Sequence, residues 1–202
     1  MADRRPPYSG YCPCRASRSS AAFGTAGHAV LEQLALAHWH GDIPALARAA
    51  SESHDLAATD LADLQARLEQ IVRQMARITA GAKELLPEWP FALTLSEDGT
   101  TLIVDGTMDL LFHSADGAWH IIDYKFTNDE AGALLKKYGL QLNLYREALL
   151  RRAGRREDRI QAKLAAIRGR NIELIDVPPD LSFARAAIQA AVALDRQLRL
   201  NH

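Results

Sequence analysis

The order of periodic segments predicts an α/β fold, with a mixed central β-sheet flanked by helices on both faces. Three helical patterns come first, three strand patterns follow as an antiparallel meander, and a helix, two further strands and a last helix complete the chain. Such an alternation of helices and strands is typical of a sheet that buries both of its faces.

The first helix is expected to begin at Gly24 and Thr25, with Thr25 as its N-cap, and to end near Trp39. A short helix is expected at 44–50. A long amphipathic helix is expected from about 60 to 82, because its leucine and isoleucine residues recur at helical spacing. These apolar faces favour packing against the sheet.

The meander is predicted as a strand at 88–95 followed by a hairpin at 104–127. The two apolar runs of the hairpin are joined by Ser114-Ala115-Asp116-Gly117, a glycine-containing turn that suits chain reversal. The remaining patterns predict a helix at about 130–152, strands at 159–168 and 171–177, and a helix from about 180 to 200.

A chain of 202 residues fits one domain with a sizeable core. Residues 1–22 are rich in proline, arginine and serine and predict an irregular basic arm, which leaves 23–202 as the single domain. The net charge of −1 argues against binding nucleic acid by bulk electrostatics alone. Without an apolar run of about 20 residues or a secretory signal, we expect a cytoplasmic protein with no membrane partner.

Two further patterns argue against a cysteine metal site and against nucleotide binding. The only cysteines, Cys12 and Cys14, stand closer together than the usual C-x-x-C metal motif, so free thiols are the simpler interpretation. No glycine-rich phosphate loop of either common kind is present, which argues against a nucleotide-binding fold.

The predicted hairpin carries a compact charged group. Asp109 lies on its first strand, and Asp123 and Lys125 lie on its second strand with side chains on the same face, opposite Tyr124. Burying such charges is costly unless they pair or bind a metal. An ordinary ion pair at a strand end is the simpler alternative.

Four local patterns, in order, resemble the PD-(D/E)XK nuclease superfamily, and specifically its RecB-like branch, which includes the nuclease domains attached to the RecB and AddA helicases. Residues 24–32 (GTAGHAVLE) resemble the helix that carries a histidine, and 104–112 (VDGTMDLLF) the strand with the first catalytic aspartate. Residues 121–127 (IIDYKFT) resemble the D-x-K core, and 141–145 (QLNLY) the Q-x-x-x-Y helix. Met108 stands where the superfamily name has proline.

The resemblance implies a restriction-endonuclease-like fold and a metal-dependent DNA nuclease, expected to be an exonuclease, that acts in DNA repair, recombination or defence. Asp109, Asp123 and Lys125 would be catalytic. Mg²⁺ or Mn²⁺ would be held by Asp109, Asp123, His28 and the backbone carbonyl of Tyr124. Lys125 would orient the attacking water and stabilise charge on the scissile phosphate.

Other residues are weaker candidates. Glu88 is expected near the site, and Gln141 and Tyr145 either contact a phosphate or steady the Lys125 strand, with ordinary packing as the alternative. A basic segment follows the active strand and could track a DNA backbone, although cations at a helix C-terminus explain part of it. Its members are Lys136, Lys137, Arg146, Arg151, Arg152, Arg155, Arg156 and Arg159.

DNA is the expected partner, together with a helicase or another repair protein. Some relatives carry a four-cysteine iron–sulfur cluster, but no cysteine follows Cys14, so none is expected. The alternative function is a non-catalytic DNA-binding or scaffolding module that keeps the fold and acts with a helicase. The intact Asp109, Asp123 and Lys125 favour the enzyme.

Overall fold

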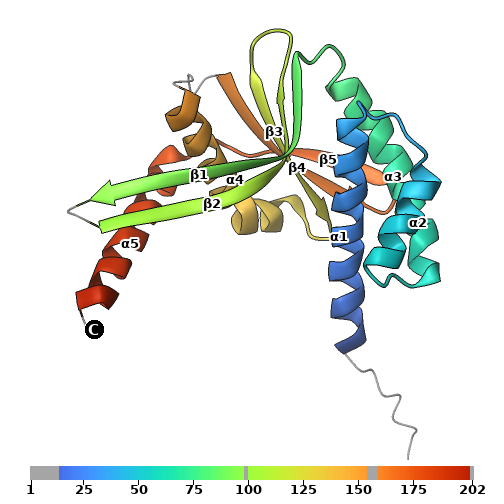
Figure 1. Cartoon of the computed structure of the whole chain (residues 1–202), viewed down its shortest axis with the longest axis horizontal. Helices are drawn as coiled ribbons and strands as arrows, with labels where there is room; N and C mark the ends of the chain where they lie inside the picture. Colours follow the sequence, from blue (N-terminus) through green and yellow to red (C-terminus); the bar gives the residue numbers. More distant parts are fainter. Residues whose placement is uncertain (1–13, 98–99, 154–158, 201–202) are drawn as a thin grey trace, which may run out of the picture.

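The computed structural model describes residues 14–97, 100–153 and 159–200. Cys12, Arg155 and Arg156 lie outside these ranges. In chain order the elements are α1 (Cys14–Leu36), α2 (Ile43–Ser53), α3 (Ala58–Ile78), β1 (Glu84–Glu97), β2 (Thr100–His113), β3 (Trp119–Phe126), α4 (Ala131–Ala153), β4 (Ile160–Arg168), β5 (Asn171–Asp176) and α5 (Leu181–Leu200) (Figure 1).

The five strands form one sheet in the order β1-β2-β3-β4-β5. All neighbours are antiparallel except β3 and β4, which run parallel from the pair Trp119–Ile160 to the pair Phe126–Ile167. A parallel pair needs a crossover connection, and α4 supplies it between these two strands. The predicted mixed sheet with an antiparallel meander is therefore confirmed.

Both faces of the sheet are covered. On β4, Leu164 and Ala166 face the core that α4 closes, whereas Ala165 and Ile167 face the core that α1, α2 and α3 close. Consecutive apolar residues on one strand are what a sheet buried on both sides requires. Figure 1 shows α1, α2 and α3 grouped to the right of the sheet. This arrangement confirms the predicted fold class.

The long β1–β2 pair extends beyond the rest of the sheet. β2 pairs with β1 along nearly its whole length, but with β3 only from Leu110 onward. The free half of the pair lies beside α5 (Figure 1), where Val104 packs against Ile188 and Val192. The sheet therefore splits between β2 and β3.

Several element boundaries differ from the prediction by a few residues, and the start of α1 differs the most. Helix α1 begins at Cys14, so the predicted irregular arm is wrong for residues 14–22. Thr25 is not an N-cap but lies inside the helix, where its hydroxyl donates to the carbonyl of Ala21. Strand β1 begins at Glu84 although Pro87 follows, because an edge strand tolerates a residue without an N–H.

None of the helices in the described ranges is both long enough and apolar enough to cross a membrane.

Arg146, predicted to face DNA, belongs to the interior instead. Its side chain is 3% exposed, and its guanidinium donates to the carbonyls of Val177 and Pro178 and to the side chain of Asn143. These bonds fasten α4 to the segment that follows β5. The prediction of a DNA-facing Arg146 is therefore wrong, because the chain uses this cation to satisfy carbonyls beyond the end of a strand.

Replacing Arg146 should destabilise the fold. Arg146→Met leaves buried carbonyls without donors, so we expect the free energy of unfolding to fall by about 2–4 kcal/mol in urea denaturation. Lys136→Met, at an exposed position of the same helix, should change it by less than about 0.5 kcal/mol. Equal effects of the two substitutions would contradict the assignment of Arg146 to the interior.

Candidate functional site

The site lies where β2 and β3 separate. The last paired residues are Leu110 and Ile122, so Asp109 and Asp123 would form the next pair. The ladder stops there, and the backbone N–H of Tyr124 donates instead to a carboxylate oxygen of Asp109 at 2.7 Å. A side-chain acceptor thus satisfies a backbone donor at the split. This bond fixes the Asp109 carboxylate at the junction of the two strands.

Glu88 reaches the same place from β1. Its neighbours pair as Pro87–Leu110 and Trp89–Met108, which sets Glu88 opposite Asp109. Glu88 itself interrupts the ladder with a φ of 47°, a left-handed conformation that costs a residue with a Cβ about 1–2 kcal/mol. Strain of this kind is found preferentially at functional sites.

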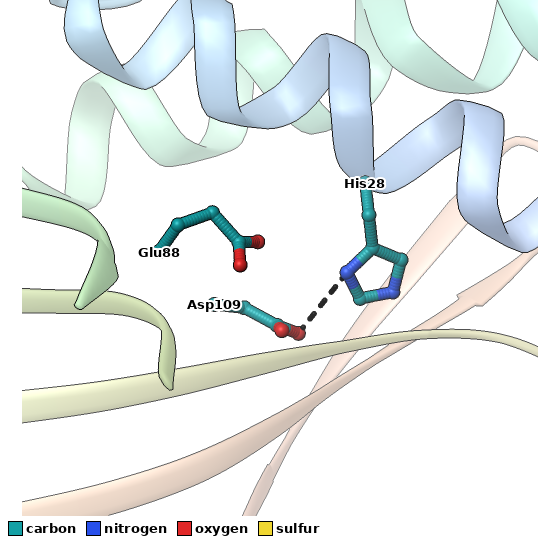
Figure 2. A group of neighbouring side chains, drawn as sticks. All are labelled: His28, Glu88 and Asp109. Carbon is teal, nitrogen blue, oxygen red and sulfur yellow. Dashed lines mark ion pairs between the residues drawn. The ribbon is translucent and has the colours of Figure 1, made fainter. Parts of the chain in front are cut away.

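His28 completes a group of three potential metal ligands. It lies on α1, and its Nδ1 is 3.4 Å from Oδ2 of Asp109. Figure 2 shows the imidazole extending from the helix toward the carboxylates of Glu88 and Asp109. One ligand atom from each of the three residues lies within 4.8 Å of the others. One imidazole and two carboxylates at this spacing fit a divalent metal cation.

Negative charge is concentrated in this group. Burial raises the pKa of Glu88, and the charges of Asp109 and Glu32 raise it further. Burial lowers the pKa of His28, but the hydrogen bond to Asp109 and the charge of Asp109 outweigh it, so the pKa of His28 is raised overall. The neighbouring carboxylates thus make both groups hold protons more tightly than usual. A bound metal ion would supply the positive charge that offsets them.

Asp123 and Lys125 form a second part of the site. Asp123 is 1% exposed, and its Oδ2 is 2.5 Å from Nζ of Lys125. Burial, helped by the charge of Asp109 and opposed by Lys125, raises the pKa of Asp123 to about 6. Asp123 is therefore next to the three-residue group while its carboxylate is paired with the lysine. The ammonium of Lys125 also lies 4.6 Å from the centre of the Tyr138 ring.

A family model described as the PD-(D/E)XK nuclease superfamily matches residues 9–199. The chain belongs to the PD-(D/E)XK nuclease superfamily. It is also 33% identical to a stretch of an ATP-dependent helicase/nuclease protein from Lysinibacillus sphaericus (strain C3-41), a match that covers 34% of this chain. That match covers only 6% of the helicase/nuclease protein, so the chain corresponds to a small part of its length.

Among solved structures, the fold resembles a candidate exonuclease from Eubacterium rectale. The sequence identity is 12% and the TM-score 0.49, with 98% of this chain and 86% of that chain covered. The superfamily named from the four sequence motifs is confirmed by the family match.

The Q-x-x-x-Y pair, Gln141 and Tyr145, contacts strand β2. The hydroxyl of Tyr145 donates to the carbonyl of Thr107 at 2.8 Å, and Nε2 of Gln141 donates to the same hydroxyl at 2.5 Å. Burial raises the pKa of Tyr145 to about 12, so the phenol keeps its proton. The pair therefore ties α4 to β2 two residues before Asp109. The sequence had left open a phosphate contact, support of the Lys125 strand and ordinary packing. The strand that the pair contacts in the structure is β2, not the Lys125 strand.

The basic segment offers fewer free cations than its sequence suggested. Lys136 is exposed, whereas Nε of Arg151 bonds to the buried Glu147 at 2.7 Å. Arg152 lies over the ring of Trp89, at 4.8 Å from its centre, and Lys137 over the ring of Tyr138. Arg159 is exposed and donates to the carbonyl of Asp116. With Arg146 buried, the exposed cations of α4 fall into two separate groups, Lys136 and Lys137 in its first half and Arg151 and Arg152 at its end.

Sequence reasoning missed one residue of the site and underrated another. Tyr138, which lies against Lys125, carries no local signal, because the contact joins α4 to β3. The sequence made Glu88 only a supporting candidate. Its carboxylate nevertheless belongs to the same group of potential metal ligands as His28 and Asp109, and that group does not include Asp123. The left-handed turn of its backbone could not be read from a segment rich in proline and apolar residues.

The strain at Glu88 predicts that one substitution will raise the stability of the fold and weaken metal binding. Asparagine tolerates the left-handed conformation and carries no charge. Glu88→Asn should therefore raise the metal-free free energy of unfolding by about 1 kcal/mol and weaken Mn²⁺ binding at least about tenfold, as measured by urea denaturation and calorimetric titration. Glu84→Asn, at an exposed position of the same strand, should change neither. Unchanged Mn²⁺ affinity in Glu88→Asn would exclude Glu88 as a ligand.

Proposed function

We propose that the chain is a Mg²⁺- or Mn²⁺-dependent DNA nuclease of the RecB-like type. The observation that carries this proposal is the convergence of His28, Glu88 and Asp109 beside the buried Asp123–Lys125 pair. A cluster of metal ligands next to a carboxylate-held ammonium is suited to phosphodiester hydrolysis, which needs an activated water and relief of negative charge.

In this proposal His28, Glu88 and Asp109 hold the ion, and Asp123 and the carbonyl of Tyr124 contribute from β3. The bound ion supplies a more acidic water and an electrophile for the phosphate oxygens. Asp109 can take part without rearrangement, because the N–H of Tyr124 already orients its carboxylate. Glu88, whose backbone is left-handed, has its carboxylate beside His28 and Asp109, where it would serve as a ligand.

Lys125 acts on the phosphate. Its ammonium is held from two sides, by the carboxylate of Asp123 and by the ring of Tyr138. Fixing the ammonium before substrate arrives means that little reorganisation is needed when charge develops on the scissile phosphate. Asp123 therefore has two roles, as a ligand candidate and as the group that positions the lysine.

The biological setting is proposed on similarity. The superfamily supports DNA as the substrate, and the stretch similar to a helicase/nuclease protein supports a helicase partner in repair, recombination or defence. The exonuclease mode rests on the RecB-like motifs. Because most of the exposed cations along α4 already contact a carboxylate or an aromatic ring, such a partner would also help to hold the DNA.

The decisive measurement is cleavage of labelled linear and circular DNA, single- and double-stranded, with Mg²⁺, Mn²⁺ or EDTA. We expect metal-dependent cleavage of the linear forms by the wild-type chain, and at least about a 10³-fold loss in Asp123→Ala. Asp105→Ala, on the exposed side of β2, is the matched control and should cleave normally. DNA binding without cleavage under every metal would favour the non-catalytic module instead.

Lys125 can be separated from metal binding. Lys125→Met should lower the cleavage rate by about 10²–10³-fold and leave Mn²⁺ bound, because the ligands remain. Removing the ammonium also leaves Asp123 buried without its partner, so the free energy of unfolding should fall by about 3 kcal/mol. Lys163→Met, which breaks the exposed pair with Asp176, should change neither cleavage nor metal affinity. Full activity in Lys125→Met would remove Lys125 from the mechanism.

A further inference from the structure

A cavity of about 760 Å³ opens beside Lys125, and its lining includes Lys125 but not its partner Asp123. The first half of α1, the start of α3, the loop after β3 and the start of α4 surround it. Lys125 is thus shared between the proposed catalytic site and the cavity wall. A ligand in this cavity would therefore lie next to the scissile phosphate that Lys125 contacts in the proposed mechanism.

The wall of the cavity is aromatic on two sides. Tyr138 forms one side, with the ammonium groups of Lys125 and Lys137 over its ring at 4.6 and 5.1 Å from its centre. Phe23 and Phe126 form another side, in edge-to-face contact at 5.7 Å between ring centres. These rings and the cations that lie over them both attract a flat ring system, which every nucleobase presents.

The charges of the lining argue against a run of phosphates. Three carboxylates, those of Asp60, Asp63 and Asp129, balance the cations of Lys125, Lys137 and Arg67. Arg67 is further engaged by Asp63 at 2.6 Å and by the ring of Phe23 at 4.9 Å. A groove that follows a nucleic-acid backbone would instead carry an excess of positive charge. The balanced lining suits a neutral base with polar edges, accompanied by one phosphate at Lys125 or Lys137.

We propose that this cavity is a subsite for one unpaired nucleotide, adjacent to the scissile phosphate. The proposal rests on the nuclease function above and extends it to the form of the substrate. Its volume lies within the range of pockets that enclose small ligands. A base that enters a cavity walled by three helices must leave its stack and its pairing partner. The chain therefore acts on single strands or on ends that fray.

Two substitutions can fill the cavity without touching Lys125. Ala21 on α1 and Asn128 in the loop after β3 are both exposed and line it from different sides. Ala21→Trp and Asn128→Trp should each raise the Kd for a short fluorescein-labelled single strand at least about fivefold in EDTA, measured by anisotropy. Binding of a blunt duplex, which stays outside the cavity, should be unchanged. Ala49→Trp, exposed on α2 and away from the cavity, is the matched control.

Cleavage of the same substrates with Mn²⁺ is measured in parallel, so the two proposals can fail separately. If the wild-type chain cleaves and both tryptophan variants bind and cleave single strands normally, the subsite is wrong and the nuclease stands. Equal weakening of single-strand and duplex binding also overturns the subsite. A wild-type chain that neither binds nor cleaves DNA overturns the nuclease function, and the subsite with it.

Discussion

The hydrogen bond from the N–H of Tyr124 to the carboxylate of Asp109 is the interaction on which the site depends. It stands where the next bond of the β2–β3 ladder would be, so the sheet can split without leaving that buried donor unsatisfied. The split lets the β1–β2 pair turn toward α5 and opens room below α1 for His28. One side chain therefore shapes the sheet and presents a metal ligand at the same point.

Crowded negative charge is the second constraint. Glu88, Asp109 and Asp123 converge in a half-buried space in which Lys125 is the paired cation, and the charge of Asp109 raises the pKa of both Glu88 and Asp123. The chain accepts this repulsion and the strained backbone of Glu88, both of which destabilise the metal-free fold. A divalent cation bound between these carboxylates would offset their mutual repulsion, which explains why the fold keeps them together.

Local patterns predicted most of the architecture. The apolar periods of α3, β3 and β4 were strong enough to define the elements, and four motifs in order named the superfamily. Errors arose where local rules compete with tertiary context. The first strand was predicted to begin only at residue 88, yet it begins before Pro87, which an edge strand tolerates. The arm at 14–22 is helical although its composition is polar. Arg146 looked like a solvent-facing cation, because nothing in its neighbours reveals the carbonyls of Val177 and Pro178.

The sequence by itself determined the fold class and the chemical types at the site, because periodicity and motif spacing are local properties of the chain. It supplied the histidine, the carboxylates and the lysine in their order. Only the tertiary structure decided which of these side chains contact or neighbour one another. Glu88 lies with His28 and Asp109, Asp123 pairs with Lys125, and Lys125 lies over the ring of Tyr138. These groupings follow from strand register, a left-handed residue and helix docking, which are set by long-range packing and backbone geometry.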